Sequence, residues 1–303
     1  MELSVLLIAA LGASVPLGLA RLLRPGLGAD ASVPPRAPGL LAQSWAPGSG
    51  TWPQRLAGVG AILGAAIAVR VALHGSWAGW PPHDAGEVLA WCTAGMLAVL
   101  VAPVLGWVTP VLLWAAFALE PYWSHHWSGS LPWLRTGGVA ATVLLLGAAF
   151  QRGLGGGGAG WQSDEGLARK VTVLLRERAG LGGVVVGGAL LLGHSTGSGA
   201  LTLGALGLAL ALRSADQLLP GGQRPWPGAA LLGALASATV VQAVLYASTP
   251  AGPAALLGGA AALLAWTPAR SSLLLLRVAL MVVASGLAVW WGWPEPDPYA
   301  GGW

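Results

Sequence analysis

The chain has 303 residues, of which 55% are hydrophobic and only 9% are charged. Soluble domains carry about 25% charged residues, so this composition excludes a soluble globular protein and indicates an integral membrane protein. The single cysteine, Cys92, excludes an internal disulfide and any CxxC metal or redox motif. The 47 glycines are typical of membrane helices that pack closely through small residues.

The first part of the chain, residues 1–151, predicts five membrane spans. Residues 3–20 are apolar without a basic segment before them, which indicates a retained span and not a cleaved signal peptide. Residues 56–73 and 136–151 each form a further span. The central stretch 88–119 has no charged residue and is too long for one upright span of about 20 residues. Its cluster of Pro103, Gly106 and Pro110 breaks a helix, so we expect a hairpin of two spans with its tip at 105–109.

A segment of different character, residues 152–180, follows. Its glycine run, 153–160, reads as a linker. Residues 163–178 predict an amphipathic helix, capped by Ser163 and lying on the membrane surface. The apolar stripe of this helix consists of Leu167, Val171, Leu174 and Leu175, whereas Arg169 and Lys170 lie off it.

The last part, residues 181–303, predicts five more spans. The polar sequence HSTGSG at 194–199 divides the run 181–212 into two spans, and a turn at 249–250 separates 228–247 from 251–266. Residues 272–292 form the last span. The expected fold is therefore all-α: a polytopic membrane bundle of about ten spans plus one interfacial helix.

Arginine placement predicts the orientation of this bundle. With both termini outside, twelve of the fifteen Lys and Arg residues fall on the cytoplasmic side, in agreement with the positive-inside rule. A single crossing at 88–119 would instead move the basic residues of 152–178 outside. Arg70 and Arg277 lie inside predicted spans near their ends, where we expect them to extend toward the interface.

The histidines lie on the predicted outer side. His83, His125 and His126 have carboxylates nearby in the sequence, and imidazole with carboxylate suits zinc, copper or haem. However, no pair has the HxxxH or HExxH spacing, and the surrounding tryptophans are typical of an interfacial aromatic belt. The sequence therefore assigns no metal, and any cofactor stays unknown. Ser195 and Ser198 beside His194 lack a G-x-S-x-G elbow and indicate a polar turn, and Cys92 indicates a buried thiol.

Three short motifs resemble a known family. They are Ser14-Val15-Pro16-Leu17-Gly18, Gly48-Ser49-Gly50 and Gly106-Trp107-Val108-Thr109-Pro110. In this order and at similar spacing, across residues 4–115, they resemble the SIPxG, GSGNxGxxN and GHxFP motifs of the bacterial acyl-phosphate:glycerol-3-phosphate acyltransferase family.

The resemblance implies a remnant of a phosphate or lipid site on the cytoplasmic side of the first spans. Its residues would be Ser14, Gly48, Ser49, Gly50 and Trp107, with Arg21, Arg24 and Arg55 beside them. The departures put the activity in doubt, because Thr51 replaces asparagine, Trp107 replaces histidine and the GGKG loop is missing. Trp107 cannot transfer a proton as a histidine would, so we expect the chemistry to be lost.

The sequence favours a non-catalytic protein of the bacterial cytoplasmic membrane, a structural or accessory subunit of a respiratory or photosynthetic type of complex. Its expected partners are the lipid bilayer, other membrane subunits and a lipid or pigment, and not nucleic acid. The alternatives are an acyltransferase-like enzyme of glycerophospholipid synthesis and a small-molecule transporter, whose spans would be broken at the midplane.

This orientation predicts the outcome of cysteine labelling. In a Cys92→Ala background, Gly156→Cys should react with an impermeant maleimide only after the cells are opened, and Ser130→Cys should react in intact cells. Labelling of both positions from the same side would exclude the hairpin orientation.

Overall fold

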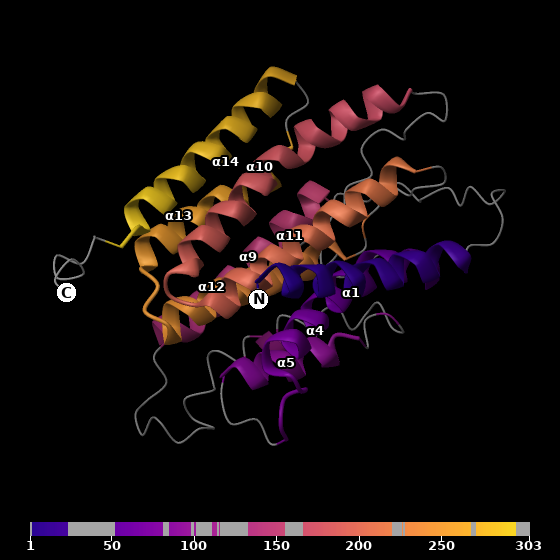
Figure 1. Ribbon diagram of the computed structural model, residues 1–303. Coiled ribbons are helices and arrows are strands. Elements are labelled where there is room, and N and C mark those ends of the chain that lie inside the picture. The colour runs from indigo at the N-terminus through magenta and orange to yellow at the C-terminus, as the bar shows by residue number, and fades with distance from the viewer. Residues whose placement is uncertain are drawn as a thin grey trace, which may run out of the picture.

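The computed structural model describes residues 2–23, 52–80, 85–97, 100, 111–113, 115, 133–154, 166–219, 226, 228–267 and 271–294. Within these ranges the regular secondary structure consists of helices, without strands. The helices stand side by side in one bundle (Figure 1). They are α1 (Glu2–Leu22), α3 (Trp52–Arg55), the π-helix η1 (Leu56–Gly60), α4 (Ala61–His74), α5 (Ala85–Gly95), α9 (Trp133–Leu154), α10 (Leu167–Gly193), α11 (Gly197–Leu218), α12 (Ala229–Tyr246), α13 (Ala251–Ala262), the 3₁₀ turn η3 (Leu263–Ala265) and α14 (Ser271–Gly292).

The long helices alternate in direction between two ends of the bundle. We call one the arginine end, defined by Arg21, Arg178, Arg213 and Arg277, and the other the opposite end, defined by His74, His194, Tyr246 and Trp293. Contacts between distant segments establish the arginine end, because Arg21 of α1 bonds Asp216 of α11 and the Trp226 indole donates to the Gly58 carbonyl.

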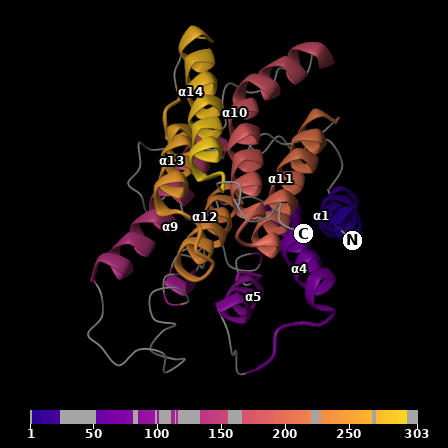
Figure 2. The same ribbon diagram turned by 60° about the vertical axis from the view of Figure 1, so that its left-hand side comes forward.

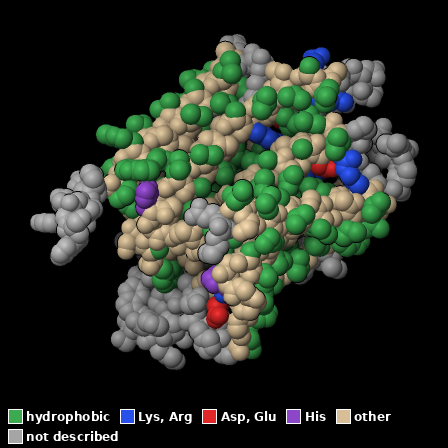
Figure 3. All heavy atoms as spheres, viewed as in Figure 1, with side chains coloured by type: hydrophobic (Ala, Val, Ile, Leu, Met, Phe, Trp, Pro, Cys, Tyr) green, Lys and Arg blue, Asp and Glu red, His purple; other side chains and the backbone are tan. Residues whose placement is uncertain are grey.

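Two further contacts establish the opposite end. The His194 and Trp293 rings meet edge to face with centroids 4.3 Å apart, and the Ser195 and Thr249 hydroxyls lie 2.5 Å apart. In Figure 3 the visible Lys and Arg side chains gather mostly toward the upper right, away from the visible His side chains. The charge asymmetry expected from the sequence is therefore an asymmetry of the folded bundle.

The number of spans differs from the prediction. Six helices in the described ranges are long and apolar enough to cross a membrane, instead of the ten expected: Leu3–Leu22, Trp52–His74, Gly137–Leu154, Gly197–Leu218, Ala229–Tyr246 and Ser272–Gly292. The predicted span at 251–266 is a shorter apolar helix, Ala251–Ala265. The breaks expected near 194–199 and 249–250 are confirmed, since α11 begins at Gly197 and α13 at Ala251.

The central stretch folds back on itself, as the hairpin prediction requires. The Cys92 thiol donates to the Leu112 carbonyl at 3.5 Å, so residues twenty apart in sequence lie together. In addition, α4 ends and α9 begins at the same end of the bundle, which excludes a single crossing between them. Within the described residues, α5 of the first arm has 11 residues and ends at Gly95. The predicted tip, 105–109, lies outside the described residues.

The predicted surface helix is not a separate element. α10 runs without interruption for 27 residues from Leu167 to Gly193, about 40 Å, and so joins the expected surface helix to the following span. Its N-cap is Gly166, and Ser163 lies outside the described residues. Only Leu174 of the predicted stripe is buried, at 5% exposure, whereas Leu167 and Leu175 are exposed. The stripe is only partly covered because just one face of α10 packs on α11 and α14.

The expected boundaries at 151 and 180 both fall inside helices, α9 and α10. Helices from the two parts of the chain also interleave, because α1 packs on α11 and α9 packs on α12. Figure 2 shows α1 and α14 at the outer edges of the bundle, with α11 and α12 between them. The described helices of the two parts therefore pack together in one bundle.

Glycines permit the closest of these helix contacts. A Cβ placed on Gly64 of α4 would lie 2.0 Å from the carbonyl oxygen of Gly12 in α1, so the two backbones touch. Pro16 of the same α1 face would lie 2.9 Å from a Cβ on Gly60. Close backbone approach through small residues is how membrane helices gain packing energy without a hydrophobic effect between them.

The α1–α4 contact predicts a stability difference between two glycine substitutions. Gly64→Ala should force the helices apart and cost about 1–3 kcal/mol, as overpacking does, lowering the melting temperature in detergent. Gly18→Ala is the control, because a Cβ there meets nothing within 4 Å. Equal melting temperatures of the two variants would show that the backbone contact contributes nothing.

Candidate functional site

Of the residues assigned to the phosphate or lipid remnant and the weak metal candidates, the structure describes three: Ser14, Arg21 and Arg55. The remaining candidates lie outside the described residues: Arg24, Gly48, Ser49, Gly50, His83, Trp107, His125 and His126. Ser14 is exposed, and its hydroxyl donates to the Leu11 carbonyl of its own helix at 3.0 Å. Its neighbour Pro16 packs against Gly60, so this part of the motif contributes to helix packing.

Arg21 forms part of a buried charge cluster. Its Nε donates to Asp216 Oδ1 at 2.6 Å, and its Nη2 donates to the Asp216 backbone carbonyl at 3.1 Å. Arg213, only 1% exposed, donates from Nη1 to the second carboxylate oxygen, Oδ2. One carboxylate therefore pairs with two guanidinium groups, one on each oxygen, and supplies the partner that the buried charge of Arg213 requires.

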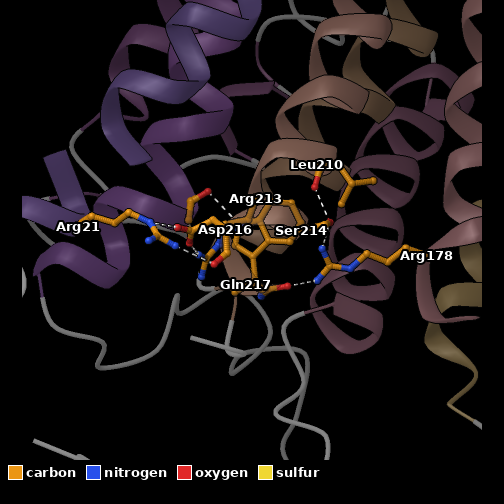
Figure 4. Close-up of polar contacts among 9 residues, drawn as sticks. Arg21, Arg178, Leu210, Arg213, Ser214, Asp216 and Gln217 are labelled. Atoms are coloured by element: carbon orange, nitrogen blue, oxygen red, sulfur yellow. Dashed lines mark hydrogen bonds and ion pairs between the residues drawn. The ribbon is translucent and has the colours of Figure 1, made fainter. Parts of the chain in front are cut away.

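A third arginine continues this cluster on the other side of α11. Arg178 of α10 donates to the Ser214 hydroxyl and, at 2.5 Å, to Gln217 Oε1. Its guanidinium also lies 5.6 Å from the centre of the Trp226 ring, a cation–π distance. Figure 4 shows Arg21 and Arg178 approaching the end of α11 from opposite sides. We call Arg21, Arg178, Arg213, Ser214, Asp216 and Gln217 the arginine cluster.

The arginine cluster leaves little room for a ligand. The cavity between Arg21, Arg213 and Asp216 has a volume of about 10 Å³, roughly what one water needs. In this structure, therefore, Arg21 holds α1 against α11 instead of facing an open anion site.

Arg55 lies close in the sequence to the first of the two predicted loops, and it bonds a residue close in the sequence to the second. Its Nη1 donates to the Leu100 carbonyl at 2.9 Å. In the sequence, Arg55 is five residues after the 48–50 motif, and Leu100 is six residues before the 106–110 motif. The chain segments flanking the two motifs thus meet at the arginine end, while the motifs themselves lie outside the described residues.

Arg277 departs from the expectation that it extends to the interface. It is 4% exposed and buried within the bundle, where it donates to the Trp266 carbonyl at 2.8 Å and to the Glu177 carbonyl at 3.4 Å. Both acceptors lie in other segments, so the guanidinium joins α14 to α10 and to the residue after η3. Packing between three segments, which local sequence does not reveal, explains the difference.

A cavity lies at the opposite end. It has a volume of about 280 Å³ and opens between α4, α5, α11 and α12. Its polar lining includes Arg70, His74, Thr196, Ser198 and Gln242, and its walls are mostly apolar. Sequence reasoning missed this site. The available signal was the i, i+4 spacing of Arg70 and His74, which places both on one face of α4.

The other candidates for chemistry have structural positions. Within the described residues, no three His, Cys, Asp or Glu side chains gather as metal ligands would. His194 packs on Trp293, and Ser195 is bonded to Thr249, so the 194–199 sequence forms the polar turn that was predicted. Cys92 is buried, also as predicted.

In comparisons with protein-family models, curated proteins and solved structures, nothing matches this chain.

The arginine cluster predicts unequal effects of its members on stability. Asp216→Asn leaves Arg213 buried without a carboxylate, and breaking such a buried pair costs about 3–5 kcal/mol. Arg21→Gln should cost less, because the Arg21 side chain is 37% exposed and the Arg213–Asp216 pair survives. Thermal unfolding in detergent measures both. If Arg21→Gln proves as damaging as Asp216→Asn, the cluster does not depend on the shared carboxylate.

Proposed function

We propose that this chain is a non-catalytic integral membrane protein, a structural or accessory subunit of a larger complex of the respiratory or photosynthetic type in the bacterial cytoplasmic membrane. The observation that carries the proposal is the outward face of α14. Only 22% of its span is buried in the bundle, compared with 61% for α12. Its last turns expose Trp290 and Trp291 by 78% and 63%. Tryptophan supplies large contact areas at interfaces and is also favoured at the membrane boundary.

The interior charges support the same proposal. Arg21, Arg213 and Asp216 satisfy one another, and Arg178 and Arg277 bond partners in other segments. These charged side chains stabilise contacts between helices, so we infer that their role is structural and not substrate binding. The orientation we propose places the arginine end in the cytoplasm and both termini outside.

Co-purification tests the subunit proposal. Extracted in a mild detergent, the 30.4 kDa chain should appear by native mass spectrometry in a heavier assembly with other membrane proteins. Trp290→Ala should weaken that association by roughly 30-fold, the effect of removing an interface residue worth about 2 kcal/mol. The control is Trp80→Ala, which alters a tryptophan of similar exposure, 76%, away from α14.

If the chain is recovered with bound lipid but without another protein, the subunit proposal is wrong. A loss of partners on Trp80→Ala equal to that on Trp290→Ala would also contradict it, because the interface would then not be the outward face of α14.

A second candidate function is an acyltransferase-like activity in glycerophospholipid synthesis. The observation that favours it is the Arg55–Leu100 hydrogen bond, which draws the flanks of the two motif loops together at the arginine end. If this candidate is correct, the purified protein acylates glycerol 3-phosphate from acyl phosphate and loses that activity on Ser49→Ala. We expect no such activity, since general acid–base help alone contributes about 10²–10⁴-fold in rate and Trp107 cannot supply it.

A further inference from the structure

The cavity at the opposite end contains the charge of Arg70, for which the described part of the chain provides no ion pair. Arg70 lines it from the penultimate turn of α4, and its Nε is buried without a hydrogen-bond partner. Neither terminal nitrogen of Arg70 has a hydrogen bond or ion pair within the described part of the chain. By contrast, Arg21, Arg55 and Arg277 each donate to an oxygen of another segment. A half-buried cation in a span is costly unless something pairs with it, and it commonly marks a functional site.

The cavity offers a second source of positive potential. α11, of 22 residues, begins at its rim with Thr196 as N-cap, and the Thr196 hydroxyl makes no capping bond and is buried without a partner. Ser198 and Gly199 of the first turn also line the cavity. The N–H groups of a first helical turn have no partner in their own helix and attract negative charge. No Asp or Glu is among the described residues of the lining, so Arg70 and the start of α11 both favour an anion.

The apolar lining of the cavity indicates that the ligand also has an apolar part. Each of the four helices contributes a leucine to the lining: Leu73, Leu89, Leu206 and Leu235. A free inorganic anion would leave these walls without an apolar contact. The volume of about 280 Å³ lies just below the roughly 300–1,000 Å³ of pockets for drug-sized ligands, so a head group and the start of one chain fit.

We propose that this cavity binds the anionic head group of an amphiphile, a carboxylate or phosphate attached to an acyl chain, with Arg70 as its counter-ion. Thr196, Ser198 and the first N–H groups of α11 donate to the same head group. The chain lies along the leucines. The site is independent of the subunit role proposed above, because it lies inside the bundle and not on the outward face of α14.

Photocrosslinking locates and tests the site. The full chain is placed in phosphatidylcholine nanodiscs and labelled with a diazirine analogue of palmitate, and the labelled peptides are identified by mass spectrometry. Labelling should concentrate on segments that line the cavity, near residues 66–77, 196–206 and 235–247. Arg70→Gln should reduce this labelling at least about tenfold, because a charge-assisted hydrogen bond is lost. Arg152→Gln, which alters an exposed arginine of α9, is the control and should leave it unchanged.

A second variant keeps the test independent of the charge. Ala66→Leu adds bulk to the lining one turn before Arg70 and should also reduce labelling. Melting temperatures without ligand separate binding from folding, because removing an unpaired cation by Arg70→Gln should not lower stability. If Arg70→Gln unfolds the protein, Arg70 has a structural role and the proposal is wrong.

Competition distinguishes the sources of the head group. Displacement of the probe by unlabelled palmitate identifies a free single-chain amphiphile, and displacement by phosphatidylglycerol identifies a bilayer lipid. Either result supports the site. Equal displacement by inorganic phosphate, labelling spread over the exposed face of α14, or full labelling of Arg70→Gln would overturn it.

Discussion

The Asp216 carboxylate, shared between Arg21 and Arg213, holds the arginine end of the bundle together. Ionised groups that are buried away from water need a partner of opposite charge. Here the Asp216 carboxylate accepts hydrogen bonds from both guanidinium groups. Because Arg21 belongs to α1 and Asp216 to α11, the pair joins segments 195 residues apart. The pair therefore contributes to holding α1 against α11, and Arg21, Arg213 and Asp216 line the small cavity there.

Close backbone contacts at glycines also hold the helices together at the arginine end. A Cβ on Gly228, just before α12, would lie 2.5 Å from the Gly58 carbonyl oxygen, and a Cβ on Gly153 of α9 would lie 2.7 Å from that of Leu264. Both contacts bring backbones together at the arginine end, where the Trp226 indole also bonds Gly58. The arginine end is thus closed by ion pairs and backbone contacts, whereas the opposite end keeps a cavity with an uncompensated arginine. Among the described residues, the cavity of about 280 Å³ at the opposite end has room for a ligand, whereas the cavity at the arginine end has about 10 Å³.

The two proposals use different surfaces of this asymmetric bundle. The outward face of α14 is suited to lipid or protein because it is apolar along its length and aromatic at one end. The cavity beside Arg70 is suited to an anionic head group because its charge is enclosed and its walls are apolar. Both can operate in one protein, and neither uses the motif loops at 48–50 and 106–110.

Local sequence determined the membrane class of the protein, most helix positions and the breaks near 194–199 and 249–250. Those features depend on runs of apolar residues and on turn-forming residues, which act over a few positions. The arginine at position 21 was also recognised, but as a phosphate ligand. Only the tertiary structure decided that Asp216 pairs with it, that α10 continues through the expected boundary at 180 and that α5 stops at Gly95. It also decided that Arg277 is buried and that Arg70 faces a cavity, because the partner of a charged side chain depends on which helices become neighbours.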